Sequence, residues 1–102
     1  MPEYIITHRF PANFKGAPDT AAAAKAWFGQ IASTIVSRSD GTVETRKLGD
    51  CGSDTLPNAY TIVNADNMEA AVELAGGWPL LERGAGIEVR QLTTREFDLA
   101  PR

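Results

Sequence analysis

Strand-like and helix-like segments alternate along this chain, and their order constrains the fold more than any single motif does. Residues 4–10 and 59–63 are rich in β-branched and aromatic residues and are bounded by turn-forming residues, which is typical of strands. Residues 42–48 and 87–92 alternate in polarity, which also favours strands. Two helical patterns separate these segments, so the predicted order is β-α-β-β-α-β.

The first helical pattern follows a loop that contains Gly16 and Pro18. Asp19 or Thr20 is the predicted N-cap, because both side chains can accept a hydrogen bond from the first turn. The apolar stripe has helical spacing and comprises Ala24, Trp27, Phe28, Ile31 and Ile35. Residues 37–41, which include the turn dipeptide Asp40-Gly41, are expected to end this helix.

The second helical pattern begins at residues 66–69, which have the form of a capping box with Asp66 as the cap and Glu69 facing it. Gly76-Gly77 are expected to supply a left-handed residue at the helix C-terminus. Trp78-Pro79 then prevents the helix from continuing.

This order predicts an α+β fold of the split βαβ type, with both helices on one face of an antiparallel sheet and residues 59–63 in a central strand. The other sheet face would lie bare. An apolar sheet face exposed to water is unfavourable in a small domain. A second copy of the chain under two-fold symmetry covers it most simply, so the topology predicts a homodimer.

A chain of 102 residues is expected to form a single domain over residues 1–102, with a core over about 3–93 and a peripheral C-terminal tail. The 10 Lys and Arg are scattered and the net charge is −3, which does not favour nucleic-acid binding. No signal peptide or membrane-spanning run is visible, so the chain is predicted to be cytoplasmic, without a membrane partner. The single cysteine, Cys51, is interpreted as a free loop thiol, and no metal or cofactor is predicted.

Four segments in register resemble short proteins of the YCII-related family. They are AWFGQI at residues 26–31, AYTIVNADNMEAAVELA at 59–75, PLL at 79–81 and GIEVR at 86–90. This resemblance implies a ferredoxin-like fold and a dimeric α/β-barrel, but many members have no assigned activity. Some relatives carry a His on the first helix and an Asp as an acid–base pair, whereas residues 20–36 here contain neither.

His8 is the first candidate for chemistry, because it is the only histidine and an imidazole titrates near neutrality. In the split βαβ sheet the last strand runs beside the first, so Glu88 is expected near His8 and is a candidate partner that would orient the imidazole. The alternative is a strand-end histidine bonded to backbone or water.

Trp27, Phe28, Tyr60 and Trp78 are candidates for lining a hydrophobic pocket, with Arg90 as a binder of a ligand carboxylate. For the aromatic residues the alternative is core packing. For Arg90 it is an ion pair with Glu88 or Glu44.

Two functions stay open at this point. One is a cofactor-independent small-molecule enzyme in which His8 moves a proton on an apolar or aromatic compound. The other is a non-catalytic ligand-binding or interaction module whose dimer is the functional unit. A convergent polar pair in a closed pocket would favour the enzyme.

Overall fold

The computed structural model describes residues 2–11, 14, 18–39, 41–42, 44–51 and 55–93. Along the chain the elements are β1 (Glu3–Pro11), α1 (Pro18–Gln30), the 3₁₀ turn η1 (Ala32–Thr34), β2 (Ile35–Ser39), β3 (Thr55–Asn64), α2 (Met68–Gly76), the 3₁₀ turn η2 (Pro79–Arg83) and β4 (Gly86–Gln91). The predicted tail after residue 93 lies outside the described residues.

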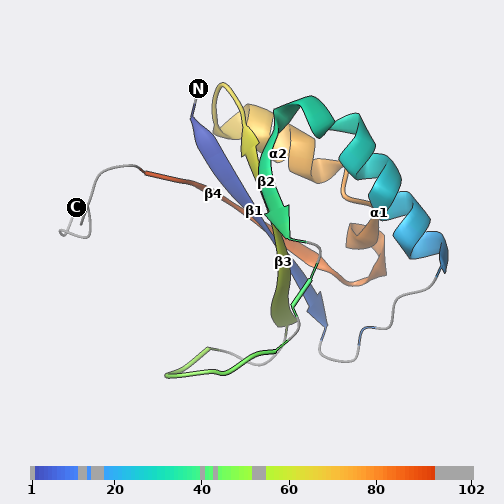
Figure 1. The fold of residues 1–102 in the computed structure, drawn as a ribbon, viewed down its shortest axis with the longest axis vertical. Coiled ribbons are helices and arrows are strands. Elements are labelled where there is room, and N and C mark those ends of the chain that lie inside the picture. The colour runs from blue at the N-terminus through green and yellow to red at the C-terminus, as the bar shows by residue number, and fades with distance from the viewer. Residues whose placement is uncertain are drawn as a thin grey trace.

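The four strands form one sheet in the order β2-β3-β1-β4, and every neighbouring pair is antiparallel. Figure 1 shows α1 and α2 on the same side of this sheet. Two crossovers over one face of an antiparallel sheet define the ferredoxin-like α+β fold, which confirms the predicted fold class. The predicted central strand is also confirmed, because β3 lies between β2 and β1.

Strand alternation assigns each residue of β1 to one of the two faces. Tyr4, Ile6 and His8 point to the helix-covered face, where each is no more than 2% exposed. On the neighbouring β3 the matching residues are Val63 and Thr61, and both are fully buried.

The opposite face of the sheet, which we call the open face, has no helix over it in the described part of the chain (Figure 1). Its centre is formed by the cross-strand pairs Ile5 with Ile62 and Thr7 with Tyr60. Arg90 lies beside Ile5 on β4 and donates from Nη2 to Oγ1 of Thr7 over 3.1 Å. The open face therefore has a small apolar centre with polar groups around it.

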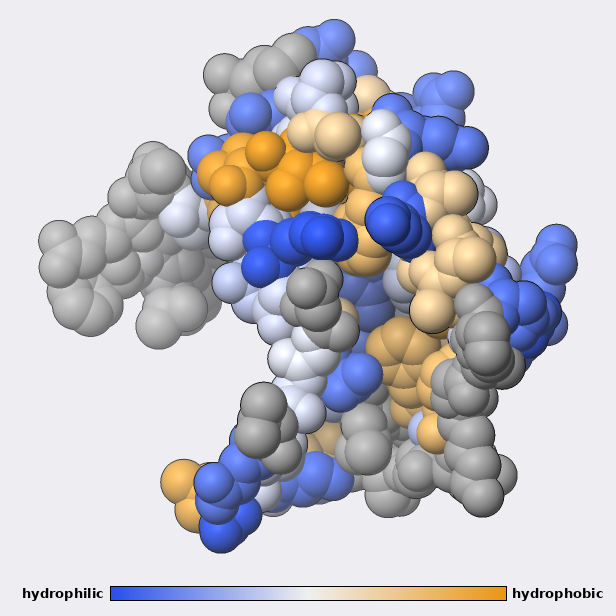
Figure 2. Space-filling view, turned by 45° about the vertical axis from the view of Figure 1, so that its right-hand side comes forward, coloured by the Kyte–Doolittle hydropathy of each residue, from blue (hydrophilic) through white to orange (hydrophobic). Residues whose placement is uncertain are grey.

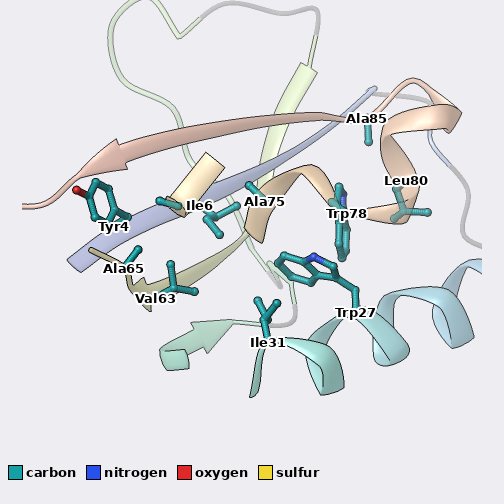
Figure 3. Close-up of a cluster of buried hydrophobic side chains, with 11 residues drawn as sticks. Tyr4, Ile6, Trp27, Ile31, Val63, Ala65, Ala75, Trp78, Leu80 and Ala85 are labelled. Atoms are coloured by element: carbon teal, nitrogen blue, oxygen red, sulfur yellow. The ribbon is translucent and has the colours of Figure 1, made fainter. Parts of the chain in front are cut away.

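The core lies between the sheet and the helices, and Figure 3 shows its side chains pointing toward one another from both layers. Trp27 of α1 packs here and donates from Nε1 to the Leu74 carbonyl over 3.0 Å. A Cβ at Gly77 would stand 3.1 Å from Cδ1 of Trp27, so any side chain there would require the indole to shift by a few tenths of an ångström. The φ of Gly77 is −78°, so the predicted left-handed residue at this position is wrong.

The second strand differs from the prediction. It was expected at residues 42–48, but Thr42 and residues 44–48 have no regular structure, and β2 is Ile35–Ser39. α1 ends at Gln30, and η1 turns the chain so that Ile35 pairs with Val63. Ile35 fits the helical spacing, yet Ile35 and Val36 are β-branched and here extend the sheet. Asp40 lies outside the described residues.

Both predicted helix caps are also wrong in position. α1 begins at Pro18, where a missing N–H has no cost, so Asp19 and Thr20 lie within its first turn. The cap of α2 is Asn67 instead of Asp66, and its side chain accepts a hydrogen bond from the Ala70 N–H over 2.8 Å.

Candidate functional site

A pocket of about 1120 Å³ opens between α1 and the sheet. α1 packs mainly against η2, and its residues along this pocket include the small Ala21, Ala24 and Gly29, which leave space in front of the strands. Figure 2 shows the surface hollowed in the middle of this side, between α1 and the projecting loop at the lower left.

His8 lies at the base of the pocket and is 1% exposed. Three aromatic rings surround its imidazole, with centroid distances of 4.4 Å to Trp78, 5.7 Å to Trp27 and 6.4 Å to Phe28. The rings come from the two ends of the helical layer, α1 and the α2–β4 connection. They remove water from the imidazole almost completely.

This loss of water sets the charge of the imidazole. Burial lowers the pKa of His8 from 6.5 to about 4, because the charged form has no solvent to stabilise it. His8 is therefore neutral at physiological pH. A neutral imidazole has one nitrogen that donates a hydrogen bond and one that accepts.

One ring nitrogen of His8 has a partner within the described structure, and the other has none. Nε2 lies 2.9 Å from Oγ1 of Thr61, on the neighbouring strand β3. Nδ1 is buried without a hydrogen-bond partner among the described residues, and so is Nε1 of Trp78 beside it. Unsatisfied buried polar atoms are uncommon in native proteins, and two on adjacent rings point to a site that an external polar group completes.

Three of the predicted aromatic residues lie with His8. Trp78 lines the pocket and contacts the imidazole. Trp27 contacts the imidazole from the core, but it does not line the pocket and its indole N–H is already used by Leu74. Core packing therefore accounts for Trp27. Phe28 lines the pocket.

The structure does not bring Glu88, Tyr60 and Arg90 to the pocket. His8 pairs with Ile87, so Glu88 is one residue out of phase and lies on the open face, where its carboxylate is 3.1 Å from Arg9. Tyr60 and Arg90 occupy the same open face. The expected pairing of Glu88 with His8 is therefore wrong. The prediction that the last strand lies beside the first strand is correct.

The sequence interpretation missed three residues at this site, two that line the pocket and one that lies buried behind His8. Thr61 is the hydrogen-bond partner of His8, and Arg38 and Lys25 lie at the pocket. Thr61 was visible as a polar residue inside the predicted strand at residues 59–63. Such a residue needs a partner when it is buried, and that requirement was the available signal.

Cys51 is exposed and lines a second, smaller hollow together with Arg9, Arg46 and Lys47. Its thiol lies 3.3 Å from the Leu48 carbonyl, consistent with the predicted loop thiol. Over the described residues, no cluster of three or more His, Cys, Asp and Glu is placed to hold a metal ion. None of the helices in that part of the chain has the length and hydrophobicity to cross a bilayer.

The fold and the pocket define a ferredoxin-like α+β protein with an aromatic-lined cavity between its first helix and its sheet. Among solved structures the chain is similar to 5-chloro-2-hydroxyhydroquinone dehydrochlorinase (TftG) from Burkholderia phenoliruptrix AC1100, in complex with 2,5-dihydroxybenzoquinone. The TM-score is 0.64 at 17% identity, over 91% of this chain and 94% of the other. At this identity the likeness shows the shared fold. No family model and no curated protein matches the sequence.

Proposed function

We propose that this protein is a small-molecule enzyme that binds a flat aromatic or quinonoid compound in the pocket and transfers a proton through His8. The observation that carries the proposal is the buried imidazole at the pocket base, whose Nδ1 has no partner among the described residues. The structural neighbour, a dehydrochlorinase bound to a flat oxygenated ring, supports this class of compound.

Thr61 orients the imidazole in this proposal. When His8 donates from Nε2 to Thr61, the lone pair of Nδ1 is left to accept a proton from the compound. When Thr61 donates to Nε2 instead, Nδ1 carries the hydrogen and donates it. In both cases a polar group of the compound completes the hydrogen bonding of His8, with the Trp78 N–H as a second donor.

The second candidate is a non-catalytic binding module. It is favoured by the 1% exposure of His8 and by the position of Glu88 on the opposite face, which leaves the imidazole without a carboxylate partner in the described structure. Such a module would use the same pocket and the same unpaired nitrogens without moving a proton.

A homodimer is part of the proposal, because the open face has an apolar centre around Ile5 and Ile62 that a second copy would cover. Membership of the YCII-related family is also part of the proposal. It is supported by the ferredoxin-like fold and by the four motifs in the sequence. Size-exclusion chromatography with light scattering should give about twice 11.0 kDa. A monomer at micromolar concentration would overturn the dimer but not the pocket.

The enzyme is tested by hydrogen exchange on a probe. 2,5-Dihydroxybenzoquinone has ring C–H bonds that exchange with deuterium from D₂O through a keto tautomer, and NMR follows the loss of the ring proton. Wild type should accelerate this exchange, and His8→Gln should reduce the acceleration by about 10²–10⁴, the usual contribution of a general acid or base.

Arg46→Gln is the matched control, because Arg46 is 80% exposed, is paired with Glu44 and lies outside the pocket. Its exchange rate should equal that of wild type. Binding of the probe without accelerated exchange would contradict the proposed enzyme and favour the non-catalytic binding module.

A further inference from the structure

A ligand must reach the imidazole of His8 for the proposed reaction, but the structure holds this imidazole closed off. His8 lies at the base of the pocket, yet it is only 1% exposed, and its Nδ1 is buried without a hydrogen-bond partner among the described residues. A ligand can bond to this nitrogen only after a neighbouring ring has moved. The rings of Trp27, Trp78 and Phe28 surround the imidazole and are therefore the candidates for a gate.

The two tryptophans are confined by the core. Trp27 is 2% exposed, and its indole N–H donates to the Leu74 carbonyl over 3.0 Å. Trp78 is 5% exposed and contacts both Trp27 and His8, with centroid distances of 5.1 and 4.4 Å. Figure 3 shows both indoles inside the buried cluster. Since protein cores are densely packed, neither indole can leave the imidazole without disturbing its neighbours.

Phe28 lies at the border between this core and the pocket. Its side chain is half-buried, lines the pocket and has no polar atom that could be held by a hydrogen bond. The pocket residues one turn before and one turn after it are the small Ala24 and Ala32. A phenylalanine in a helix has two favourable χ1 angles, so this ring can turn between them with space on the pocket side.

Arg38 of β2 stacks on the outer side of the Phe28 ring. Its Cζ stands 4.1 Å from the ring centroid, in a cation–π contact. Arg38 pairs across the sheet with Thr61, the residue that bonds to His8, so the contact comes from the strand layer over the same site. A contact of this kind shifts a conformational equilibrium by about two- to fivefold, which favours the closed ring without fixing it.

We infer that Phe28 is a gate over His8, whose ring closes the path from the pocket to the imidazole and opens it by turning toward Ala24 and Ala32. This inference rests on the proposed function, because it names what controls access to the same site. The closed ring is the state in the structure, so the open state is a minor one, with a population of about 0.1–10%.

Diethyl pyrocarbonate tests the gate without any substrate, because it acylates a neutral imidazole that it can reach. His8 is the only histidine, so the absorbance of the acylated imidazole reports this residue alone. Wild type should react about 10–10³ times more slowly than N-acetylhistidine, in line with the small open population. Phe28→Ala removes the gate and should react at least about tenfold faster than wild type.

Phe10→Ala is the matched control. Phe10 is also a half-buried phenylalanine that lines the pocket, but its ring packs against Phe14, with centroids 4.9 Å apart. This variant should react at the wild-type rate. Circular dichroism should show that both variants are folded. If Phe28→Ala does not fold, Phe28→Leu takes its place, because leucine keeps apolar volume without a planar ring, and it should also raise the rate.

Low concentrations of urea distinguish rotation of the ring from global unfolding. Rotation of one side chain exposes little surface, so the rate in wild type should hardly change with urea below the unfolding transition. A rate that rises with the full slope of global unfolding would overturn the gate, because His8 would then react only in the unfolded chain.

Three further results would each overturn the inference: an unchanged rate in Phe28→Ala, an equal rise in Phe10→Ala, and a wild-type rate equal to that of N-acetylhistidine. Failure of the gate can be told from failure of the proposed enzyme, because the modification needs no substrate. Faster modification in Phe28→Ala without deuterium exchange in wild type contradicts the enzyme alone. Deuterium exchange in wild type with an unchanged modification rate in Phe28→Ala contradicts the gate alone.

Discussion

Nε2 of His8 lies 2.9 Å from Oγ1 of Thr61, and the two residues form a diagonal pair across β1 and β3 on the helix-covered face. His8 stands opposite Ala59, and Thr61 stands opposite Ile6. Both side chains are buried, at 1% and 0% exposure. This pair fixes a neutral imidazole inside the core of a small domain and links the stability of the fold to pH.

The first prediction concerns stability in acid. The unfolded chain takes up a proton on His8 below its usual pKa of 6.5, whereas burial holds the folded-state pKa at about 4. Stability is therefore complete above pH 6.5 and falls as the pH drops toward 4, by on the order of 3 kcal/mol. Urea denaturation between pH 4 and 7.5 measures it.

His8→Gln is the control for this loss, because glutamine keeps polarity and approximate size but does not titrate. The variant should be less sensitive to pH over the same range. An unchanged slope of stability against pH in His8→Gln would show that other groups cause the loss.

The second prediction concerns the tautomer of His8. With only one histidine in the sequence, its imidazole signals in NMR spectra are unambiguous. Wild type should show one neutral tautomer at pH 7, selected by Thr61. Thr61→Val keeps the shape but removes the oxygen, so the tautomers should mix and stability should fall by about 1–3 kcal/mol.

Thr7→Val is the matched control, since Thr7 is also a buried threonine on this sheet but faces the open side and accepts from Arg90. It should leave the imidazole signals in place. If His8 in Thr61→Val keeps the same single tautomer as in wild type, Thr61 does not position the imidazole.

The third prediction concerns Gly77. A methyl group there would meet Cδ1 and Nε1 of Trp27 at 3.1 and 3.2 Å, and Nε1 donates to Leu74. Gly77→Ala should therefore displace the indole and cost about 1–3 kcal/mol, as overpacking does. Thermal unfolding and tryptophan fluorescence measure the two effects.

Gly76→Ala provides the comparison, because nothing lies within 4 Å of a Cβ at Gly76. This change should be neutral or slightly stabilising, as alanine favours helix. Equal effects at the two neighbouring glycines would contradict the close approach of Trp27.

The fourth prediction uses two neighbours on β3 that face opposite sides. Val63 is fully buried under the helices, so Val63→Ala should cost about 2 kcal/mol at every protein concentration. Ile62 lies on the open face and is half-buried. Under the proposed dimer, Ile62→Ala should mainly weaken association, so its effect on unfolding should grow with protein concentration.

Denaturation at two concentrations separated a hundredfold distinguishes these effects. A concentration-independent loss in Ile62→Ala would argue against the open face as the dimer interface. A neutral Val63→Ala would contradict the position of β3 at the centre of the core.

The elements that were predicted well are those whose local pattern agrees with their packing. Residues 59–63 lie in β3 and residues 66–76 contain α2, because dense β-branched residues and an Asx-type cap favour one structure each. β2 was missed because Ile35 fits a helical stripe and a strand equally well. Ile35 is in a strand because it pairs with Val63 of β3, a contact that the local sequence does not reveal.

The candidate site was predicted in part for a similar reason. The topology correctly placed the start of β4 beside His8. It did not give the register, and a shift of one residue turns a side chain to the other face. That single step separates Ile87, which shares a face with His8, from Glu88, which does not. Thr61 and Arg38 reach the site across strands, where spacing along the chain carries no information.

The irregularity in the β1–β3 pairing has a consequence for the wall of the pocket. His8 pairs with Ala59 and Arg9 with Pro57, so Asn58 is an extra residue outside the ladder, and its carbonyl accepts from Thr42 over 2.7 Å. Asn58 borders the pocket in front of His8, the hollow that contains Cys51, and a third hollow beside Thr7 and Tyr60. Its side chain is exposed and lies outside the core and the β1–β3 pairing, so a substitution there should leave both intact. A change at Asn58 would therefore alter the wall of the pocket while the fold is kept.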